Sequence, residues 1–575
     1  MLKLFRRLGP WAPSIAVVLA LVFAQSIADL SLPTLMSDIV DEGIAKGDIP
    51  FIWRTGLWML LLAFAGIVSN LVGGFLASRA ALGFGRELRS SIFRRVSSWS
   101  LDGIDRFGAA SLVTRTTNDV TQVQQVLFMM LRMMAMAPMM AIGGLVMAVS
   151  KEPKLSWILA VSVPVLVAAI SVIAAKGLPL FTAIQEKLDA LNRVLREKLS
   201  GIRVIRAFDR AAYEQGRFEE ANRDLTDVTL KVNRLVSLLF PFVMLVMNLT
   251  TIAIVWFGGL AIDSGDVRIG SLMAFIQYSM QIMFSVVMVS VIFIMVPRAS
   301  ASALRINEVL GTDDSIRDPE RPATPPEPAG RVEFRDVDFR YPGAEEPALR
   351  GVSFVAEAGK VTAIIGSTGS GKTTVLNLIE RFHDASSGAV LVDGVDVREY
   401  RQAELRARLG YAPQKALLFS GSVAENVRFG APGADDAAVA RALSVAQAAD
   451  FVGAMEGGSG ASVTQGGTNV SGGQRQRLAV ARAVARDPSV YLFDDTFSAL
   501  DARTDARLRA ALRSETSGST VIMVAQRVGS IMDADRIVVL DEGRVAAIGT
   551  HDELLEGNAV YREIVQSQLS AEAEA

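Results

Sequence analysis

A glycine-rich run between an apolar segment and a helical pattern carries the clearest chemical signal in this sequence. It reads Gly366-Ser-Thr-Gly-Ser-Gly-Lys-Thr373, after the predicted strand Val361–Ile365 and before the predicted helix Thr374–Arg381. Glycines let successive backbone amides curve around phosphate oxygens, so this arrangement predicts a loop that binds nucleotide phosphates. We expect Lys372 to reach the β- and γ-phosphates and the Thr373 hydroxyl to coordinate Mg²⁺.

A second signal is an apolar run that ends in a carboxylate, Val490-Tyr-Leu-Phe-Asp494. In enzymes with a phosphate-binding loop, such a strand holds the aspartate that orients the Mg²⁺ shell. Buried strands ending in aspartate are common, so this run gains its meaning from the loop. Together the two runs predict binding of ATP and Mg²⁺, with phosphate-site residues Gly366, Ser367, Thr368, Gly369, Ser370, Gly371, Lys372, Thr373 and Thr374.

The composition places these motifs in a membrane protein. The 575 residues are 51% hydrophobic and 21% charged, too apolar for an ordinary soluble enzyme. Residues 1–310 hold 30 basic and 22 acidic side chains, and residues 311–575 hold 28 and 38. Neither half is strongly basic, which excludes a nucleic-acid partner. The lack of Cys excludes disulfides and Cys-ligated metals, and two His exclude a His-rich metal site.

Six runs in the first half are apolar enough to cross a bilayer, which takes about 20 residues each. They are Trp11–Leu32, Gly56–Ala77, Val126–Ser150, Leu155–Ala175, Leu235–Ile262 and Leu272–Val296. The loop after the second run is rich in arginine, so the positive-inside rule places it, the N-terminus and the second half in the cytoplasm. The first run is interpreted as a retained span, not a removed signal peptide. Helical spacing continues beyond the runs, so we expect long cytoplasmic extensions with a turn at each tip.

The second half predicts an α/β domain. Five prolines within 319–328 mark an extended connector, and short apolar runs such as Val332–Phe339 then alternate with helical stretches. The expected fold class is therefore a six-helix membrane bundle followed by an α/β P-loop NTPase domain. The expected domains are 1–310 for the membrane domain, 311–330 for a Pro-rich linker, 331–570 for the nucleotide-binding domain and 571–575 for a tail.

Two features of the membrane half suggest a solute site. Methionines are frequent in the third, fifth and sixth runs, and flexible thioethers suit a cavity for varied apolar shapes, although lipid-facing or gap-filling methionines fit the pattern too. A charge at mid-bilayer costs about 2.5–3.5 kcal/mol, so Asp29 faces a cavity or a partner unless the first run ends there. The candidate cavity residues are Asp29, Met133, Met140 and Met283.

The run Asn469-Val-Ser-Gly-Gly-Gln-Arg-Gln-Arg477 indicates a particular family of nucleotide-binding proteins. It resembles the signature of ATP-binding cassette (ABC) transporters, and the resemblance to their exporters covers essentially the whole chain. The resemblance implies further roles: Tyr341 stacks on adenine, Gln414 is the Q-loop glutamine beside Mg²⁺, and Asp501 belongs to the D-loop. It also implies that two inner-loop segments, Gly108–Asp119 and Gly201–Phe208, dock on the cassettes. In this family two cassettes sandwich two ATP molecules, so a second, homologous chain would present its ATP to the signature residues Ser471, Gly472, Gly473 and Gln474.

Two positions depart from the family pattern. The family has a catalytic Glu after the Mg²⁺ aspartate and a switch His after the next strand, where this sequence has Asp495 and Gln526. Asp is one methylene shorter than Glu, so the carboxylate of Asp495 is withdrawn by more than about 1 Å. A misplacement on this scale can cost roughly 100-fold in rate. Gln can donate a hydrogen bond but cannot carry a proton. These changes resemble the degenerate half of heterodimeric bacterial exporters, which binds ATP and hydrolyses it slowly.

The expected function is therefore one subunit of a heterodimeric, ATP-driven exporter in a bacterial plasma membrane. It would move a hydrophobic or amphipathic solute such as a drug, lipid or peptide, with Gln414, Asp495 and Gln526 as the catalytic-site residues, and with membrane lipid and a homologous half-transporter as partners. Three alternatives stay open: a homodimer that uses Asp495 as its base, an importer with an exporter fold, and an ATP-binding scaffold that transports nothing.

Overall fold

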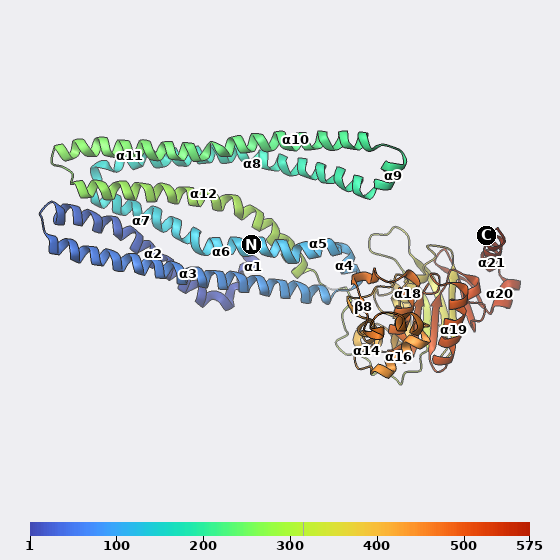
Figure 1. Cartoon of the computed structure of the whole chain (residues 1–575). Helices are drawn as coiled ribbons and strands as arrows, with labels where there is room; N and C mark the ends of the chain where they lie inside the picture. Colours follow the sequence, from blue (N-terminus) through green and yellow to red (C-terminus); the bar gives the residue numbers. More distant parts are fainter. Residues whose placement is uncertain (314, 575) are drawn as a thin grey trace. The chain divides into compact units, whose positions relative to one another are not determined.

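The computed structural model describes residues 1–313 and 315–574 and forms two compact units (Figure 1). The helical unit comprises Met1–Ser97 and Ala109–Thr312, and the sheet unit comprises Ser98–Gly108 and the chain from Asp313 onward. Residue 314 of the expected linker and residue 575 of the expected tail lie outside the described residues. The expected fold class, an apolar helical bundle joined to an α/β domain, is confirmed.

Six long helical stretches build the helical unit, and each contains one of the six predicted apolar runs (Figure 1). They are 42 to 53 residues long, about twice what a bilayer needs, so they extend beyond it as expected. A helix satisfies every backbone group within itself, which is why such apolar sequence is helical. In chain order the elements are α1 (Leu2–Phe5), η1 (Arg6–Trp11), α2 (Ala12–Asp38) and the π-helical turn η2 (Ile39–Ile44); α3 (Ile49–Ser97); α5 (Ala109–Thr114), the π-helical turn η3 (Arg115–Asp119), α6 (Val120–Met129), the π-helical turn η4 (Met130–Met134) and α7 (Ala135–Lys151); η5 (Pro153–Leu155) and α8 (Ser156–Ser200); α9 (Ile202–Ala207), α10 (Ala211–Ser237) and α11 (Leu239–Asp263); and α12 (Ile269–Gly311).

Small residues on α3 let α2 pack closely against it. Cβ atoms added at the buried Gly66 and Gly73 would lie 3.5 Å from the Cβ atoms of Ala28 and Leu21 respectively. Because lipid offers no hydrophobic force between helices, close van der Waals contact of this kind holds membrane helices together.

Charged side chains join the outer ends of the helices. Lys151 at the end of α7 pairs with Asp38 at the end of α2, with Nζ and Oδ1 3.1 Å apart. Asp41 accepts a hydrogen bond of 2.7 Å from the backbone amide of Gly270 in the first turn of α12. These contacts tie together the ends of α2 and α7 and join η2 to the start of α12.

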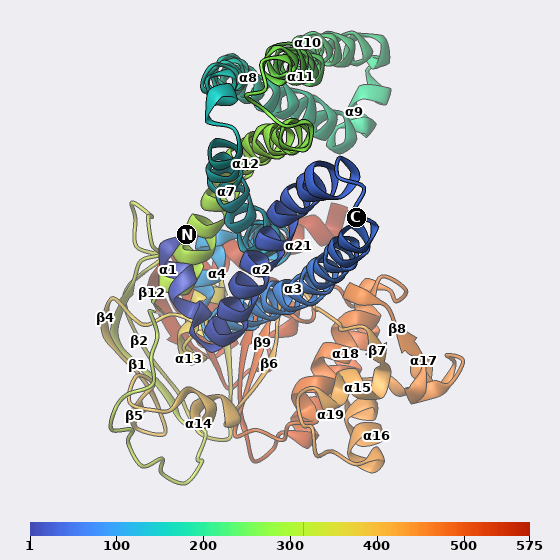
Figure 2. The same cartoon turned by 90° about the vertical axis from the view of Figure 1, so that its left-hand side faces the viewer.

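The sheet unit has two layers of apolar core around a six-stranded sheet of order β12-β11-β3-β10-β9-β6. Every strand in it is parallel to its neighbour except β12. Alternate residues of the wholly buried β9 face different cores: Tyr491 and Phe493 pack with α16 and α18, while Val490 and Leu492 pack with α13 and a second, antiparallel sheet of order β2-β1-β4-β5. Figure 2 shows this second sheet on one side of β6 and β9 and helices α15, α16 and α18 on the other.

The strands of the sheet unit are β1 (Val332–Phe339), β2 (Leu349–Ala356), β3 (Val361–Gly366), β4 (Ser387–Val392), β5 (Val395–Asp396), β6 (Leu409–Ala412), β7 (Gly421–Ser422), β8 (Ser462–Val463), β9 (Val490–Asp494), β10 (Thr520–Val524), β11 (Arg536–Asp541) and β12 (Arg544–Gly549). Its helices are α4 (Leu101–Phe107), α13 (Lys372–Ile379), α14 (Gln402–Ala407), α15 (Val423–Arg428), α16 (Asp436–Val445), α17 (Ala449–Gly453), α18 (Gly472–Val484), α19 (Ala502–Glu515), α20 (His551–Gly557) and α21 (Ala559–Glu574).

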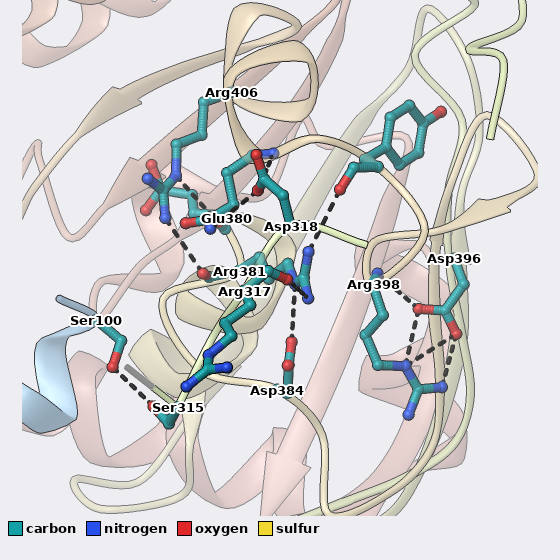
Figure 3. A network of polar contacts seen from close by, with 12 residues as sticks. Ser100, Ser315, Arg317, Asp318, Glu380, Arg381, Asp384, Asp396, Arg398 and Arg406 are labelled. Carbon is teal, nitrogen blue, oxygen red and sulfur yellow. Dashed lines mark hydrogen bonds and ion pairs between the residues drawn. The ribbon is translucent and has the colours of Figure 1, made fainter. Parts of the chain in front are cut away.

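Short helices, not the simple turns expected, stand at the two cytoplasmic tips: α4 follows α3, and α9 follows α8. Trp99 stacks on Phe107 with ring centroids 5.1 Å apart, which gives the 98–108 segment a small apolar core. This segment belongs to the sheet unit, where Ser100 Oγ lies 2.8 Å from Ser315 Oγ (Figure 3). The docking segment therefore precedes the expected Gly108–Asp119, since the chain from Ala109 belongs to the helical unit.

Candidate nucleotide-binding site

The predicted site residues follow the carboxyl ends of parallel strands, which meet at one edge of the sheet. The loop at 366–373 follows β3, and Asp494 ends β9, paired in register with Val524 at the end of β10. Gln414 comes two residues after β6, and Gln526 two residues after β10. Ligands of parallel α/β sheets bind at this edge, so the topology gathers the candidates around one place.

The glycine-rich loop depends on the backbone freedom of Gly371. Its φ of 96° is left-handed, and an added Cβ would lie 2.7 Å from the carbonyl oxygen of Ala348. This turn starts α13 at Lys372, two residues before the predicted start, and the helix ends at Ile379 instead of Arg381. Arg381 itself adopts a left-handed φ of 52°, which ends the helical path.

Lys372 lies across the mouth of this loop. Its Nζ donates hydrogen bonds to the carbonyls of Gly366 at 2.9 Å and Ser367 at 2.7 Å. Burial lowers the pKa of Lys372, and the carboxylates of Asp495 and Asp494 act against that shift. An incoming phosphate would give this buried ammonium a stronger, charged acceptor.

The donor set beside the loop fits Mg²⁺. The Thr373 hydroxyl donates to Oδ1 of Asp494 at 3.1 Å, so a hydroxyl and a carboxylate oxygen already lie together. Burial raises the pKa of Asp494, and neighbouring Asp495 raises it further, while Thr373 and Lys372 oppose this. A cation would relieve that cost, and oxygen atoms are the ligands that Mg²⁺ prefers. The buried Ser370 hydroxyl has no hydrogen-bond partner among the described residues, leaving a polar group available to a phosphate.

Asp495 and Gln414, two of the predicted catalytic-site residues, contact each other. Gln414 Nε2 donates to Oδ2 of Asp495 at 3.3 Å. Asp495 has a left-handed φ of 45°, and its amide donates to the carbonyl of Val524 at 3.0 Å. Gln526 is exposed, and within residues 1–313 and 315–574 its side chain makes no hydrogen bond, although its carbonyl accepts one from Gln568 at 2.6 Å.

Tyr341 stands beside the P-loop helix, where a base could stack on it. Its hydroxyl lies 3.0 Å from the Thr374 hydroxyl, and its ring meets those of Phe339 and His383 edge-on at 4.8 and 5.3 Å. These contacts hold the half-buried ring in one orientation with part of it exposed.

Tyr341→Ala should weaken ATP binding at this site about tenfold, within the ~1–3 kcal/mol that stacking a base on an aromatic ring contributes. Tyr341→Phe, which keeps the ring and loses the Thr374 contact, is the matched control and should bind nearly as well. Binding of a fluorescent ATP analogue to the purified chain measures both. Equal affinity in Tyr341→Ala and the unsubstituted chain would place the base elsewhere.

His383 links this ring to the 98–108 segment, a connection the sequence analysis missed. Its side chain is buried, and Nδ1 lies 3.0 Å from Oδ1 of Asp102, an ion-pair distance that does not have hydrogen-bond alignment. The two residues are 281 positions apart, so no local pattern could reveal the contact. One imidazole thus separates Tyr341 from α4.

The signature residues form the N-terminus of α18. The Ser471 hydroxyl accepts from the Gln474 amide at 3.3 Å, and Gln474 Oε1 accepts from the Ser471 amide at 2.8 Å. Asp501 caps α19 by accepting from the Thr504 amide at 2.9 Å, and this bonding lowers the pKa of Asp501. In the described part of the chain, no hydrogen bond or ion pair joins Ser471–Gln474 to Gly366–Thr374. The predicted phosphate loop and the predicted signature residues are therefore not bonded to each other in the described structure.

The structure separates the four candidate cavity residues. Asp29 lies inside α2, nine residues before its last residue, and its Oδ1 is 3.7 Å from where a Cβ on Gly66 would be. Met140 and Met283 are buried in two different apolar clusters, and Met133 is half-buried in η4. An apolar groove of about 590 Å³ between α7 and α8 has none of the four in its lining.

Behind the P-loop helix lies a buried carboxyl group that sequence reasoning also missed. Glu380 is 5% exposed, and its Oε2 has no hydrogen-bond partner among the residues described. Arg406 instead donates to the backbone carbonyls of Glu380 and Arg381, both at 3.3 Å (Figure 3). Burial raises the pKa of Glu380 well above its usual range, with Arg406 opposing and Asp494 adding to the rise.

Glu380→Gln should remove a pH-dependent loss of stability. A carboxyl whose folded-state pKa is raised stabilises the fold below its unfolded pKa near 4.3, and this contribution is lost as pH rises through the folded pKa. The variant's advantage in unfolding free energy should therefore widen as pH rises above the unfolded pKa, by at most about 1.4 kcal/mol per pH unit. Thermal unfolding of the detergent-solubilised chain measures it, and the exposed Glu345→Gln is the control. A pH-independent gap would contradict the raised pKa.

Two family models match the chain. The model described as ABC transporter transmembrane region matches residues 15–286, and the model described as ABC transporter matches residues 349–498. An uncharacterized ABC transporter ATP-binding protein of Mycobacterium tuberculosis (strain CDC 1551 / Oshkosh) is 43% identical over 575 residues, which cover 99% of this chain and 98% of that protein. The chain belongs to the ABC transporter family.

Further similarities refine this ABC transporter's place in the family. A fatty acid ABC transporter ATP-binding/permease protein of Mycobacterium bovis is 32% identical over 482 residues, 84% of this chain and 76% of that protein. A solved bacterial Atm1-family ABC exporter with ATP bound matches with a TM-score of 0.80 and 25% identity, over 98% of both chains. The chain is an exporter-type half-transporter, a multi-pass membrane protein with a cytoplasmic ATPase domain.

Proposed function

We propose that this ABC chain is the slow-hydrolysing subunit of a heterodimeric exporter. The observation that carries the proposal is a complete ATP cradle with a shortened base: Lys372, Thr373 and Asp494 are arranged for ATP and Mg²⁺, while Asp495 stands where a longer carboxylate is usual. Thr373 and Asp494 would hold Mg²⁺, which when bound would supply Lewis-acid chemistry to the phosphates.

The geometry around Asp495 supports slow chemistry. Its carboxylate is tied back to Gln414, and its backbone is fixed by the bond to Val524, so side-chain rotation does not easily recover the missing length. Gln526 can donate one hydrogen bond to a γ-phosphate but offers no proton to transfer. Bound ATP would then be hydrolysed slowly, because neither Asp495 nor Gln526 would effectively promote the reaction at its terminal phosphate.

The signature would serve the partner instead. Among the described residues, no hydrogen bond or ion pair joins Ser471 or the start of α18 to this chain's own loop. The amides there can bind a phosphate brought by another cassette. A homologous partner with Glu and His at the two departing positions would complete the fast site.

The solute proposed is hydrophobic or amphipathic. The helical unit is built of apolar helices, and a relative carries the name fatty acid transporter. Outward transport follows the similarity to a solved exporter. The plasma membrane of a bacterium is the proposed location, since the relatives compared are bacterial.

The test compares two substitutions in the purified heterodimer. Replacing the partner's catalytic glutamate should nearly abolish ATP turnover, while Asp495→Ala should leave most of it. The reverse ranking would overturn the proposal. Rapid ATP turnover by this chain reconstituted alone would favour a homodimer with Asp495 as its base. ATP-dependent solute uptake into inside-out vesicles separates export from import and from a scaffold that moves nothing.

A further inference from the structure

Arg132 places a charge inside the third membrane span, where sequence reasoning passed over it. It is the central residue of the π-helical turn η4, and its side chain is half-buried. Charged groups within spans are costly and usually face a partner, a cavity or a ligand. Single π-helical turns within helices also occur often at functional sites.

The length of the helix after Arg132 indicates the depth of this residue in the bilayer. Arg132 lies 19 residues before Lys151, the outer end of α7. At about 1.5 Å per residue this is roughly 28 Å, close to the ~30 Å thickness of the hydrocarbon layer. The guanidinium therefore lies at the cytoplasmic side of the bilayer. Asp29, only nine residues before Asp38, lies about 14 Å from the outer end of its helix, near mid-bilayer.

No acidic side chain among the described residues pairs with Arg132. Its Nη2 donates to the amide oxygen of Asn70 at 3.1 Å, and no carboxylate of the described residues lies within 4.0 Å of the guanidinium. One neutral acceptor uses one of five N–H donors. The others are available in the planar fork that matches a carboxylate or phosphate.

A glycine of α3, Gly74, lies beside the guanidinium of Arg132 and leaves room for it. A Cβ added at Gly74 of α3 would lie 3.0 Å from Nη1 and 3.6 Å from Cζ of Arg132. Asn70 and Gly74 are one helical turn apart on the same face of α3, so a polar group and a gap stand together. The guanidinium therefore lies next to the backbone of Gly74, and Asn70 accepts one of its hydrogen bonds.

We propose that Arg132 and Asn70 bind the anionic head group, a carboxylate or phosphate, of an amphiphile at the cytoplasmic leaflet. The inference deepens the export role proposed above, since such a ligand would be either the transported solute or an anionic membrane lipid held by the transporter. Two polar residues would then recognise the head group, and the surrounding apolar helices would contact the hydrocarbon chain of the amphiphile.

The experiment measures binding without ATP, so it does not depend on whether Asp495 is slow. Oleate and its uncharged analogue oleyl alcohol are bound to the full transporter in phosphatidylcholine nanodiscs. Arg132→Gln should weaken oleate binding about tenfold to a hundredfold, the worth of charged hydrogen bonds, and leave the alcohol unchanged. Arg132→Lys keeps the charge and loses the planar fork, so its oleate affinity should lie between those of the unsubstituted protein and Arg132→Gln. Arg79→Gln, an exposed arginine of α3, is the matched control and should match the unsubstituted protein.

A second arm separates the two sources of the ligand. Native mass spectrometry counts phosphatidylglycerol retained by the unsubstituted protein and by Arg132→Gln. Loss of retained lipid in the variant, without specific oleate binding in either, assigns the site to membrane lipid; displacement of oleate by phosphatidylglycerol assigns both to one site. Equal oleate affinity and equal lipid retention in all variants, or equal loss of oleate and oleyl alcohol, would overturn the proposal.

Discussion

Gly472→Glu should lower ATP turnover of the assembled heterodimer about a hundredfold or more, the scale at which lost transition-state donors act. Gly472 is exposed at the first turn of α18, and an added Cβ would meet nothing within 4 Å. The new carboxylate would stand where the partner's γ-phosphate is expected and repel it. It would not weaken the helix, because a negative charge at a helix N-terminus is favourable.

The matched control is Gly518→Glu, the same chemical change at another exposed glycine with open space around it. Gly518 precedes β10, at the edge of the sheet opposite the P-loop, so turnover should be unchanged. Phosphate release by the nanodisc-embedded heterodimer measures both variants, with thermal unfolding as the check on folding. Full activity of Gly472→Glu would show that the signature serves no hydrolysing site.

Asp495→Glu combined with Gln526→His should raise the ATP turnover of assemblies made from this chain alone by about 10- to 100-fold. The added methylene returns the carboxylate toward the γ-phosphate, and imidazole restores a group that can carry a proton. The exposed Gln526 side chain has no hydrogen bond in the described structure, so its replacement breaks no contact.

Asp495→Asn with Gln526→His is the comparison for this repair. It adds the same imidazole while removing the base, so it should stay as slow as the unsubstituted chain. Single-turnover hydrolysis separates a faster chemical step from tighter ATP binding. A chain that already turns over ATP quickly without substitution, or a repaired chain that stays slow, would contradict the degenerate-site proposal.

The parts of the site that could be predicted from sequence are those fixed by local backbone chemistry. The loop 366–373 needs glycines in a set order, and an apolar run ending at Asp494 identifies its strand. Predicting the exact start of α13 failed because the left-handed turn at Gly371 brings Lys372 into the helix, a conformation that spacing alone does not specify.

Other features arise only when distant segments meet. Asp102 reaches His383, and Arg406 reaches the carbonyl of Glu380, through tertiary packing with no counterpart in local periodicity. Arg132 could have been noticed, since it is the one basic residue in the predicted run Val126–Ser150. A count of apolar residues over the whole run gives little weight to one charged residue, so Arg132 was missed.

The membership of Ser98–Gly108 in the sheet unit has a practical consequence for chimeras. Trp99 is 7% exposed there, and Asp102 lies against the buried His383, so residues 313–574 by themselves would present an unfilled surface at this place. A transplant of the ATPase module into another half-transporter should therefore carry both pieces of chain. If only residues 313–574 are transplanted, the surface that here contacts Ser98–Gly108 would instead meet the corresponding segment of the other half-transporter.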